Sequence, residues 1–216
     1  MNIAIFGASG ATGKLLTSRC LAAGYNVAAL VRTPGAFRMT SEPPSRLRVI
    51  EGNAFDPAAV LNTIDGSNVV LSALGARSLK REDVLEQAVP LIILAMQQTG
   101  VRRIIVLGSA GAIATSLNKQ SASRRWFAEK ILYKTLLKWP IASQISQWKN
   151  LSNSNLEWTM VMPPMLTNAP ARGSYRVAGD ALPRNGSRIS RGDVADFMMQ
   201  QIGNPQWIRR GVYLTW

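Results

Sequence analysis

Histidine is absent from this chain of 216 residues, and cysteine occurs only once, at Cys20. The first absence excludes imidazole acid–base catalysis and the Ser-His-Asp and Cys-His nucleophile systems. With one cysteine, the sequence also predicts no metal site and no internal disulfide. A single buried thiol suits a reducing compartment, so we expect a cytoplasmic protein with Cys20 in its core.

Long apolar runs are missing as well. The longest, residues 89–96, contains Pro90 and is too short to cross a bilayer. An expected strand follows Met1 at once, so the sequence predicts no signal peptide. The length suits one domain with a sizeable buried core.

Acidic residues are scarce: there are 12, against 25 lysines and arginines, for a formal net charge of +13. Such a charge suggests nucleic acid or an acidic membrane surface as a partner. The basic residues are scattered, however, with no basic tail and no recognisable nucleic-acid module. We therefore favour a soluble protein whose basic face attracts small polyanions, and keep the two macromolecular partners as weaker alternatives.

A glycine-rich loop at residues 7–13 organises the rest of the chain. The apolar residues 2–6 predict a buried strand before it, and residues 14–23 predict an amphipathic helix after it. Glycines let the backbone approach a pyrophosphate, and a helix N-terminus presents free N–H groups to it. The spacing is G-x-x-G-x-x-G. We expect a dinucleotide to contact Gly7, Ser9, Gly10, Ala11, Thr12 and Gly13.

The last residue of the second expected strand (25–32) indicates which dinucleotide is bound. An acidic residue at this place would bind the ribose 2′-hydroxyl of NAD, but the chain has Arg32 there and no Asp or Glu before Glu42. A guanidinium can bind a 2′-phosphate through two hydrogen bonds. The sequence therefore favours NADP(H), with Arg38 assisting. The alternative for Arg32 is a solvated charge at a strand end.

The third and fourth expected strands, residues 47–51 and 68–74, are followed by small or amide residues. Asn53 and Ala54 follow the third strand, where the adenine should lie, and the Asn53 amide could bind its edge. Asp56 is better explained as the cap of a helix that starts at Pro57. Small residues after the fourth strand let the dinucleotide pass close to the backbone; the contacts expected there are Leu74, Gly75 and Ala76.

The fifth and sixth expected strands, residues 102–108 and 156–162, lead toward the nicotinamide. Ser109 follows the fifth strand and is our candidate catalytic residue and a further cofactor contact. Its alternative is a turn or capping serine. Pro163 and Pro164 follow the sixth strand and should form a rigid turn beside the nicotinamide. Residues 163–190 would then form a small substrate annex with a short strand at 174–177.

The strands and helices alternate, which predicts an α/β fold: one doubly wound parallel sheet with helices on both faces. Near the end, Ser190 should cap a helix that carries Asp193 in its first turn.

Residues 118–150 are basic and aromatic. Their spacing predicts a helix with one buried side, separated by Pro140 from the next helix. Three interpretations remain: a lid over the active site, a membrane-surface helix, or a partner surface. We favour the lid.

Three stretches resemble a known family. Residues 6–13 and 30–32 look like the start of atypical short-chain dehydrogenases/reductases. Residues 161–164 and 173–177, and then residues 187–198, resemble the flavin reductase and biliverdin-IXβ reductase branch. The resemblance implies a Rossmann-like fold and an NADPH-dependent reductase of a planar conjugated acceptor such as a flavin, quinone or tetrapyrrole. It implies cofactor contacts at Gly10, Thr12, Gly13, Arg32, Asn53, Leu74, Gly75 and Pro163, with Ser109 at the substrate.

The sequence departs from that family in two places. Asn53 stands where the family often has Asp, and Met165 stands where the Pro-Pro pair of the flavin and biliverdin reductases is followed by His. The wider superfamily's Tyr-x-x-x-Lys pair is also missing, since no tyrosine is followed four residues later by lysine. Alcohol dehydrogenation needs such a proton shuttle.

We therefore predict hydride transfer from NADPH to an electron-poor small-molecule acceptor, with Ser109 positioning it and solvent supplying the proton. The alternative is a catalytically weak NADP(H) sensor or assembly protein, with residues 118–150 as its partner surface.

Overall fold

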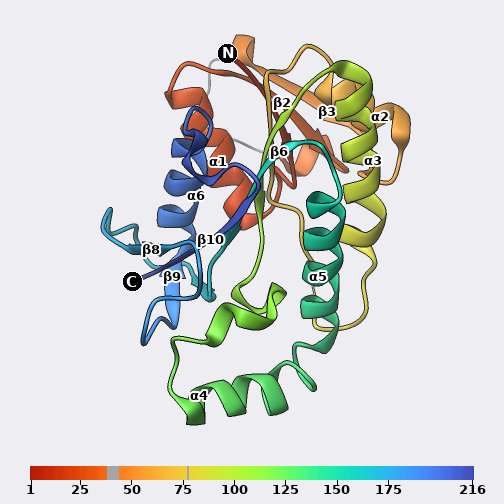
Figure 1. Ribbon diagram of the computed structural model, residues 1–216. Coiled ribbons are helices and arrows are strands. Elements are labelled where there is room, and N and C mark those ends of the chain that lie inside the picture. The colour runs from red at the N-terminus through yellow and green to blue at the C-terminus, as the bar shows by residue number, and fades with distance from the viewer. Residues whose placement is uncertain (38–43, 77) are drawn as a thin grey trace.

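The computed structural model describes residues 1–37, 44–76 and 78–216 (Figure 1). The strands are β1 (Asn2–Phe6), β2 (Asn26–Val31), β3 (Leu47–Glu51), β4 (Val69–Ser72), β5 (Arg103–Leu107), β6 (Glu157–Met162), β7 (Met165–Thr167), β8 (Arg176–Ala178), β9 (Arg188–Ser190) and β10 (Arg210–Thr215). The helices are α1 (Ala11–Ala22), α2 (Pro57–Ile64), α3 (Val84–Thr99), α4 (Ala122–Phe127), α5 (Lys138–Ser152) and α6 (Arg191–Gln200). Short 3₁₀ or π turns are η1 (Pro34–Ala36), η2 (Pro44–Arg46), η3 (Ala110–Ala112), η4 (Ala114–Leu117), η5 (Ala128–Leu132) and η6 (Pro205–Trp207).

Eight strands form one sheet in the order β3-β2-β1-β4-β5-β6-β10-β8. All neighbours pair in parallel except β8, which runs antiparallel to β10 at the edge. The chain moves outward from β1 to β3 and then returns to the other side of β1 at β4. Because the strand order reverses there, the carboxyl ends of β1 and β4 border a crevice, which is where open α/β sheets bind ligands.

Helices cover both faces of the sheet (Figure 1). Helices α1 and α6 pack together on one face, while α3 packs against both α2 and α5 on the other. Each face has its own apolar core. Cys20 is fully buried in the core under α1, and burial raises its pKa to about 12. The prediction of a doubly wound sheet with a buried Cys20 is confirmed.

The predicted annex, residues 163–190, contains a second small sheet in which β7 and β9 pair in parallel. The short strand expected at 174–177 lies at Arg176–Ala178 and joins the main sheet instead, as β8. Ser190 caps α6 by accepting a hydrogen bond from the backbone N–H of Asp193, as predicted. Asp193 has a second role besides placing a negative charge in the first turn of α6. Its buried carboxylate also accepts hydrogen bonds from the N–H groups of Arg172 and Gly173 and from the indole of Trp216.

Two expectations for residues 118–150 are wrong. Pro140 does not separate two helices but lies in the first turn of α5, where a missing N–H is tolerated because it would have no intrahelical partner. The helix with a buried side is also absent. Residues 122–132 form the short α4 and the π turn η5, and neither contains a buried residue.

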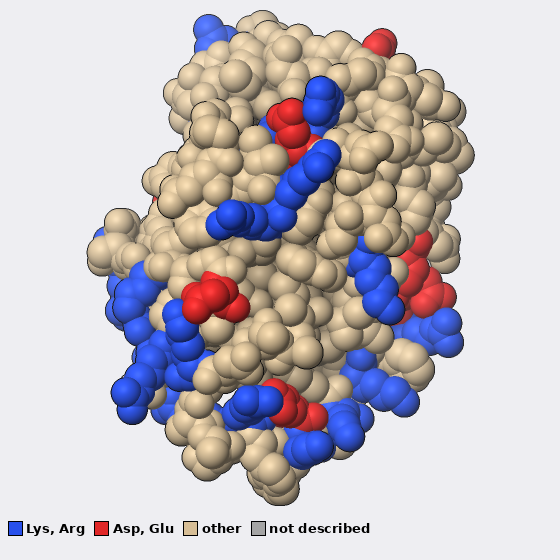
Figure 2. All heavy atoms as spheres, viewed as in Figure 1, with Lys and Arg blue, Asp and Glu red and all other residues tan. Residues whose placement is uncertain are grey.

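Lysine and arginine outnumber acidic residues on the face shown in Figure 2, above all in its lower half. Among the described residues, no helix is both long and apolar enough to span a lipid bilayer.

Candidate functional site

The loop between β1 and α1 is held tightly against the end of β4. Gly7 has a positive φ of 75°, and a Cβ there would lie 2.7 Å from the carbonyl carbon of Ala73. The N–H of Gly10 donates to the carbonyl of Gly7 over 3.0 Å and closes the turn. Only glycine meets both the conformation and the space at residue 7. The loop therefore exposes its backbone in the crevice between β1 and β4.

Helix α1 begins directly on this loop. Its N-cap is Gly10, and no side chain caps its first turn. The first N–H groups of a helix have no intrahelical partner, so they remain available to an anion, which the helix dipole also favours. A Cβ on Gly13 would lie 2.0 Å from the carbonyl oxygen of Gly7. This glycine thus allows the close packing of helix on loop, and it does not line the cavity described next.

A cavity of about 620 Å³ lies along the carboxyl ends of β1 to β5. This volume is within the range of small-molecule sites. The structure brings together twelve of the predicted site residues in its lining: Gly7, Ser9, Gly10, Ala11, Thr12, Arg32, Asn53, Ala54, Leu74, Gly75, Ala76 and Ser109. Gly13, Pro163 and Pro164 do not line it. Arg38 lies outside the described residues.

One end of the cavity is formed by the residues that follow β2 and β3. Arg32 is exposed directly after β2 and lines the cavity. Asn53 lines it too, while its side-chain oxygen accepts a hydrogen bond from the N–H of Phe55 at 3.3 Å. Asp56 instead caps α2 by accepting from Ala58 at 2.9 Å, as predicted. This end therefore presents a guanidinium and an amide at the place expected for the adenosine.

The other end of the cavity is built around Ser109, directly after β5. Its hydroxyl oxygen accepts a long hydrogen bond, 3.4 Å, from the N–H of Gly111, so Ser109 both lines the cavity and caps η3. Pro163 is buried behind this turn, and its carbonyl accepts from the N–H of Ala110 at 2.9 Å. The proline therefore fixes the Ser109 turn from behind, without facing the cavity.

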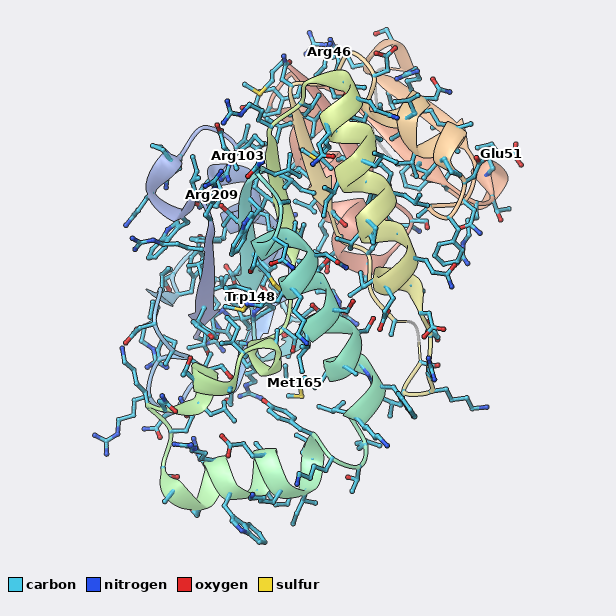
Figure 3. All side chains as sticks on the ribbon, turned by 45° about the vertical axis from the view of Figure 1, so that its right-hand side comes forward. Arg46, Glu51, Arg103, Trp148, Met165 and Arg209 are labelled. Atoms are coloured by element: carbon cyan, nitrogen blue, oxygen red, sulfur yellow. The ribbon has the colours of Figure 1, made fainter. Side chains whose placement is uncertain are left out.

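Helix α5 supplies lining residues that the sequence analysis missed: Pro140, Ile141, Ser143 and Gln144. The Ser143 hydroxyl donates to the carboxylate of Glu86 on α3 over 2.7 Å, which ties the two helices together beside the cavity. The buried Gln147 amide donates to the carbonyl of Leu107 at 3.1 Å. Further along α5, Trp148 packs edge-on against Trp158 of β6 with ring centres 5.0 Å apart (Figure 3).

The sequence carries a signal for these residues that the sequence analysis did not use. Positions 140, 143, 144 and 147 are spaced three or four residues apart, as on one face of a helix. The annex also contributes to the cavity through Leu166, and α6 does so through its first residue, Arg191. Arg191 donates to the side-chain oxygen of Asn168 over 2.7 Å.

The chemistry of the lining is restricted. Its charged side chains, among the described residues, are Arg32, Glu82 and Arg191, and its hydroxyls belong to serine and threonine. No tyrosine, lysine or cysteine occurs in that described lining. Within residues 1–37, 44–76 and 78–216, no group of three or more acidic or cysteine side chains could hold a metal ion.

The strand order, the glycine loop and the crevice define a dinucleotide-binding α/β protein of the Rossmann type. The chain belongs to the NAD(P)H-binding family, whose pattern it matches over residues 7–205.

Solved structures with the same fold cover this chain almost completely. A short-chain dehydrogenase/reductase of the wide type from Veillonella parvula, solved with NADP, is 20% identical (TM-score 0.79; 100% of this chain, 94% of that one). A candidate NADH-flavin reductase from Streptococcus pneumoniae is 23% identical (TM-score 0.78; 100% and 99%). The anaerobillin reductase of Escherichia coli O157:H7 is 19% identical (TM-score 0.77; 100% and 97%).

Proposed function

We propose that this protein is an NADPH-dependent oxidoreductase that reduces a planar conjugated small molecule of the flavin, quinone or tetrapyrrole type. The observation that carries the proposal is the continuity of the cavity. One space joins the uncapped start of α1 and Arg32 to Ser109 and the apolar residues of α5. A dinucleotide and an acceptor could therefore meet within it.

The residues present fit NADPH. The first turn of α1 and the loop from Gly7 would hold the pyrophosphate, and Arg32 would hold the 2′-phosphate. No carboxylate lies near Arg32 in the sequence to repel that phosphate, since the first acidic residue is Glu42. Bound NADPH supplies a hydride. The solved relatives named for NADP, flavin and anaerobillin support this choice of cofactor and acceptor.

The chain's own residues then contribute placement more than proton transfer. Leu137, Ile141 and Leu166 give the acceptor end an apolar lining that excludes water. The Ser109 hydroxyl can donate a hydrogen bond to the acceptor, because it uses only its oxygen to accept from Gly111. Holding donor and acceptor together in this way lowers the barrier without a charged catalyst.

An electron-poor conjugated acceptor suits this site better than a carbonyl or an alcohol. Reduction of a carbonyl requires a proton on oxygen as the hydride arrives. The described lining offers no tyrosine or lysine for that step. The same absence favours the second candidate, an NADP(H) sensor that binds the dinucleotide without turnover.

Nucleotide titration tests the cofactor assignment. Arg32→Glu should weaken NADPH binding by about 10- to 100-fold, since a charge-assisted hydrogen bond contributes about 1.5–3 kcal/mol, and should leave NADH binding within a few fold. The matched control is Lys149→Glu, an exposed residue in the last turn of α5. If Arg32→Glu retains the preference for NADPH, the assignment is wrong.

An acceptor panel of flavins, quinones and tetrapyrroles then separates the two candidates. The reductase should oxidise NADPH with at least one class, and Ser109→Ala should lower the rate with that acceptor while NADPH affinity is kept. Tight NADPH binding without turnover of any acceptor in the panel would instead support the NADP(H) sensor. We expect the protein to act in the cytoplasm.

A further inference from the structure

Residues 122–136, which we call the arm, project from the end of the molecule that bears the carboxyl ends of the strands. The arm comprises α4, the π turn η5 and the turn that leads into α5. Figure 1 shows α4 apart from the layered body and far from the N-terminus. No arm residue is buried, and none lines the cavity. Of the segment favoured as a lid from the sequence, only residues from Leu137 onward lie beside the cavity, so only these residues could form a lid.

The arm exposes large apolar side chains. Trp126, Phe127 and Leu136 are 58%, 53% and 54% exposed, and Ile131 is 40% exposed. Single exposed apolar residues are ordinary, but a cluster of this kind marks an interaction surface. Of the fourteen large apolar side chains exposed in the described chain, five fall within residues 126–139. The fifth is Trp139, at the start of α5.

Basic side chains share this surface. Those within or next to the arm are Arg124, Arg125, Lys130, Lys134 and Lys138, all of them exposed. The one acidic residue, Glu129, is paired with Arg125 at 2.9 Å. Lys130 and Lys134 form no ion pair with any residue that the structure describes. Figure 2 shows basic side chains around the lower end of the molecule.

The two kinds of side chain alternate along the arm. Trp126 and Phe127 end α4, Lys130 and Ile131 follow in η5, and Lys134 lies in the turn before α5; all five are exposed. Aromatic and aliphatic residues interleaved with lysine are typical of helices that lie in a membrane interface. There the apolar parts enter the headgroup region and the lysine stems extend toward the phosphates.

We propose that the arm seats this protein on an anionic lipid surface, without spanning the bilayer. Trp126, Phe127 and Leu136 would enter the boundary between headgroups and acyl chains, and Lys130 and Lys134 would bind lipid phosphates. Nucleic acid fits less well, because it is bound in basic grooves where aromatic rings stack on bases. Here the apolar side chains, aliphatic ones included, project from a protruding tip.

The proposed surface continues to the rim of the cavity. The guanidinium of Arg81 and the ammonium of Lys138 lie 5.4 and 4.7 Å from the centre of the Trp139 ring. Leu79, close to Arg81 in the sequence, is 48% exposed and lines the cavity. Exposed Met165 lies on the same side of the molecule as α4 (Figure 3). Docking would thus bring the cavity opening next to the lipid. This inference does not depend on the proposed reductase activity.

Vesicle co-sedimentation tests the proposal. The intact protein should bind vesicles of equal parts phosphatidylcholine and phosphatidylglycerol and not vesicles of phosphatidylcholine alone, with affinity falling as salt is raised. Reversing three charges, Lys130→Glu, Lys134→Glu and Lys138→Glu, should weaken binding at least about 100-fold, since each basic residue near such a surface contributes about fivefold.

A matched triple controls for net charge: Arg46→Glu, Lys149→Glu and Arg210→Glu. These exposed residues lie toward the amino ends of the strands, away from the arm: Arg46 just before β3, Lys149 near the end of α5 and Arg210 at the start of β10. Arg46 marks that end in Figure 3. This control triple changes the formal charge by the same amount as the arm triple. It should bind vesicles with an affinity within about threefold of that of the unmodified protein, because charges farther from the lipid than a Debye length are screened.

A third variant, Trp126→Ser with Phe127→Ser, tests insertion. It keeps every charge and should lose at least about tenfold in affinity, because two large apolar side chains no longer enter the interface. Unchanged melting temperatures and NADPH affinities would show that all three variants are folded. The proposal is overturned by any of three results: no binding to anionic vesicles, equal losses in the two charge triples, or vesicle binding unaffected by the serine pair.

Discussion

Replacing Gly13 by alanine tests whether the close approach of α1 to the glycine loop holds the cofactor site together. The added Cβ would lie 2.0 Å from the carbonyl oxygen of Gly7 and 2.7 Å from its carbonyl carbon. Ordinary contact distances are about 3.5 Å, so helix and loop would have to separate by about 1.5 Å. Both neighbouring atoms belong to the backbone, so no side chain can move aside.

The expected cost follows from two opposing effects. Overpacking costs about 1–3 kcal/mol, and a contact with fixed backbone belongs at the upper end of that range. Alanine regains about 1 kcal/mol over glycine within a helix. The net destabilisation should be about 2 kcal/mol, which lowers the melting temperature of a chain of this size by about 4–8 °C. NADPH affinity should fall at least about tenfold, because the N–H groups of α1 move away from the loop.

Thermal unfolding and NADPH titration measure both effects. The control is Gly203→Ala, which lies outside the cavity: an added Cβ there has no neighbour within 4 Å, so the melting temperature and the NADPH affinity should both stay unchanged. A Gly13→Ala protein with unaltered melting temperature and NADPH affinity would refute the reasoning.

Three further predictions concern buried groups. Burial opposes the charge on Asp193, but hydrogen bonds to the carboxylate outweigh it and lower its pKa. The ionised carboxylate therefore stabilises the fold above the ordinary pKa of aspartate, and this stabilisation is lost as pH falls through the lowered pKa. Asp193→Asn should cost about 2–4 kcal/mol at pH 7. On acidification, the unfolding free energy of this variant should fall less than that of the unmodified protein. Arg103→Met should cost about 3–5 kcal/mol in urea unfolding, because the guanidinium donates to three oxygens at 2.7–2.8 Å and each buried acceptor that loses its donor costs about 1–3 kcal/mol. Cys20 should react with a thiol reagent only on unfolding, since burial raises its pKa to about 12.

The sheet and the cofactor end of the site could be predicted because short-range rules decide them. Residues 3–6 are apolar and are followed by Gly7, which needs a positive φ, so strand, turn and helix follow from local chemistry. Parallel strands separated by helices place their carboxyl ends at one edge. Arg32 and Ser109 were therefore assigned to the same side of the sheet, and the structure brings both into one cavity.

The end of the cavity lined by α5 could not be predicted because it depends on tertiary contacts. Proline is tolerated in the first turn of a helix and disfavoured in its interior, and only the position of the helix start decides which applies to Pro140. The role of Pro163 was similarly hidden. Its carbonyl, which any residue would carry, accepts a hydrogen bond from Ala110, while Pro163 itself does not line the cavity.

The exposed arm follows from the topology as a whole. Helices α1 and α6 already cover one face of the sheet, and α2, α3 and α5 cover the other. Residues 122–136 lie between β5 and α5, and in the folded chain these five helices leave no face of the sheet for them. Their apolar side chains can pack only at the edge, where Ala128 and Tyr133 reach the core and Trp126 and Phe127 do not. A periodic apolar pattern predicts burial only if the fold has a surface left to bury it against. Where none is left, the same pattern indicates a partner outside the chain.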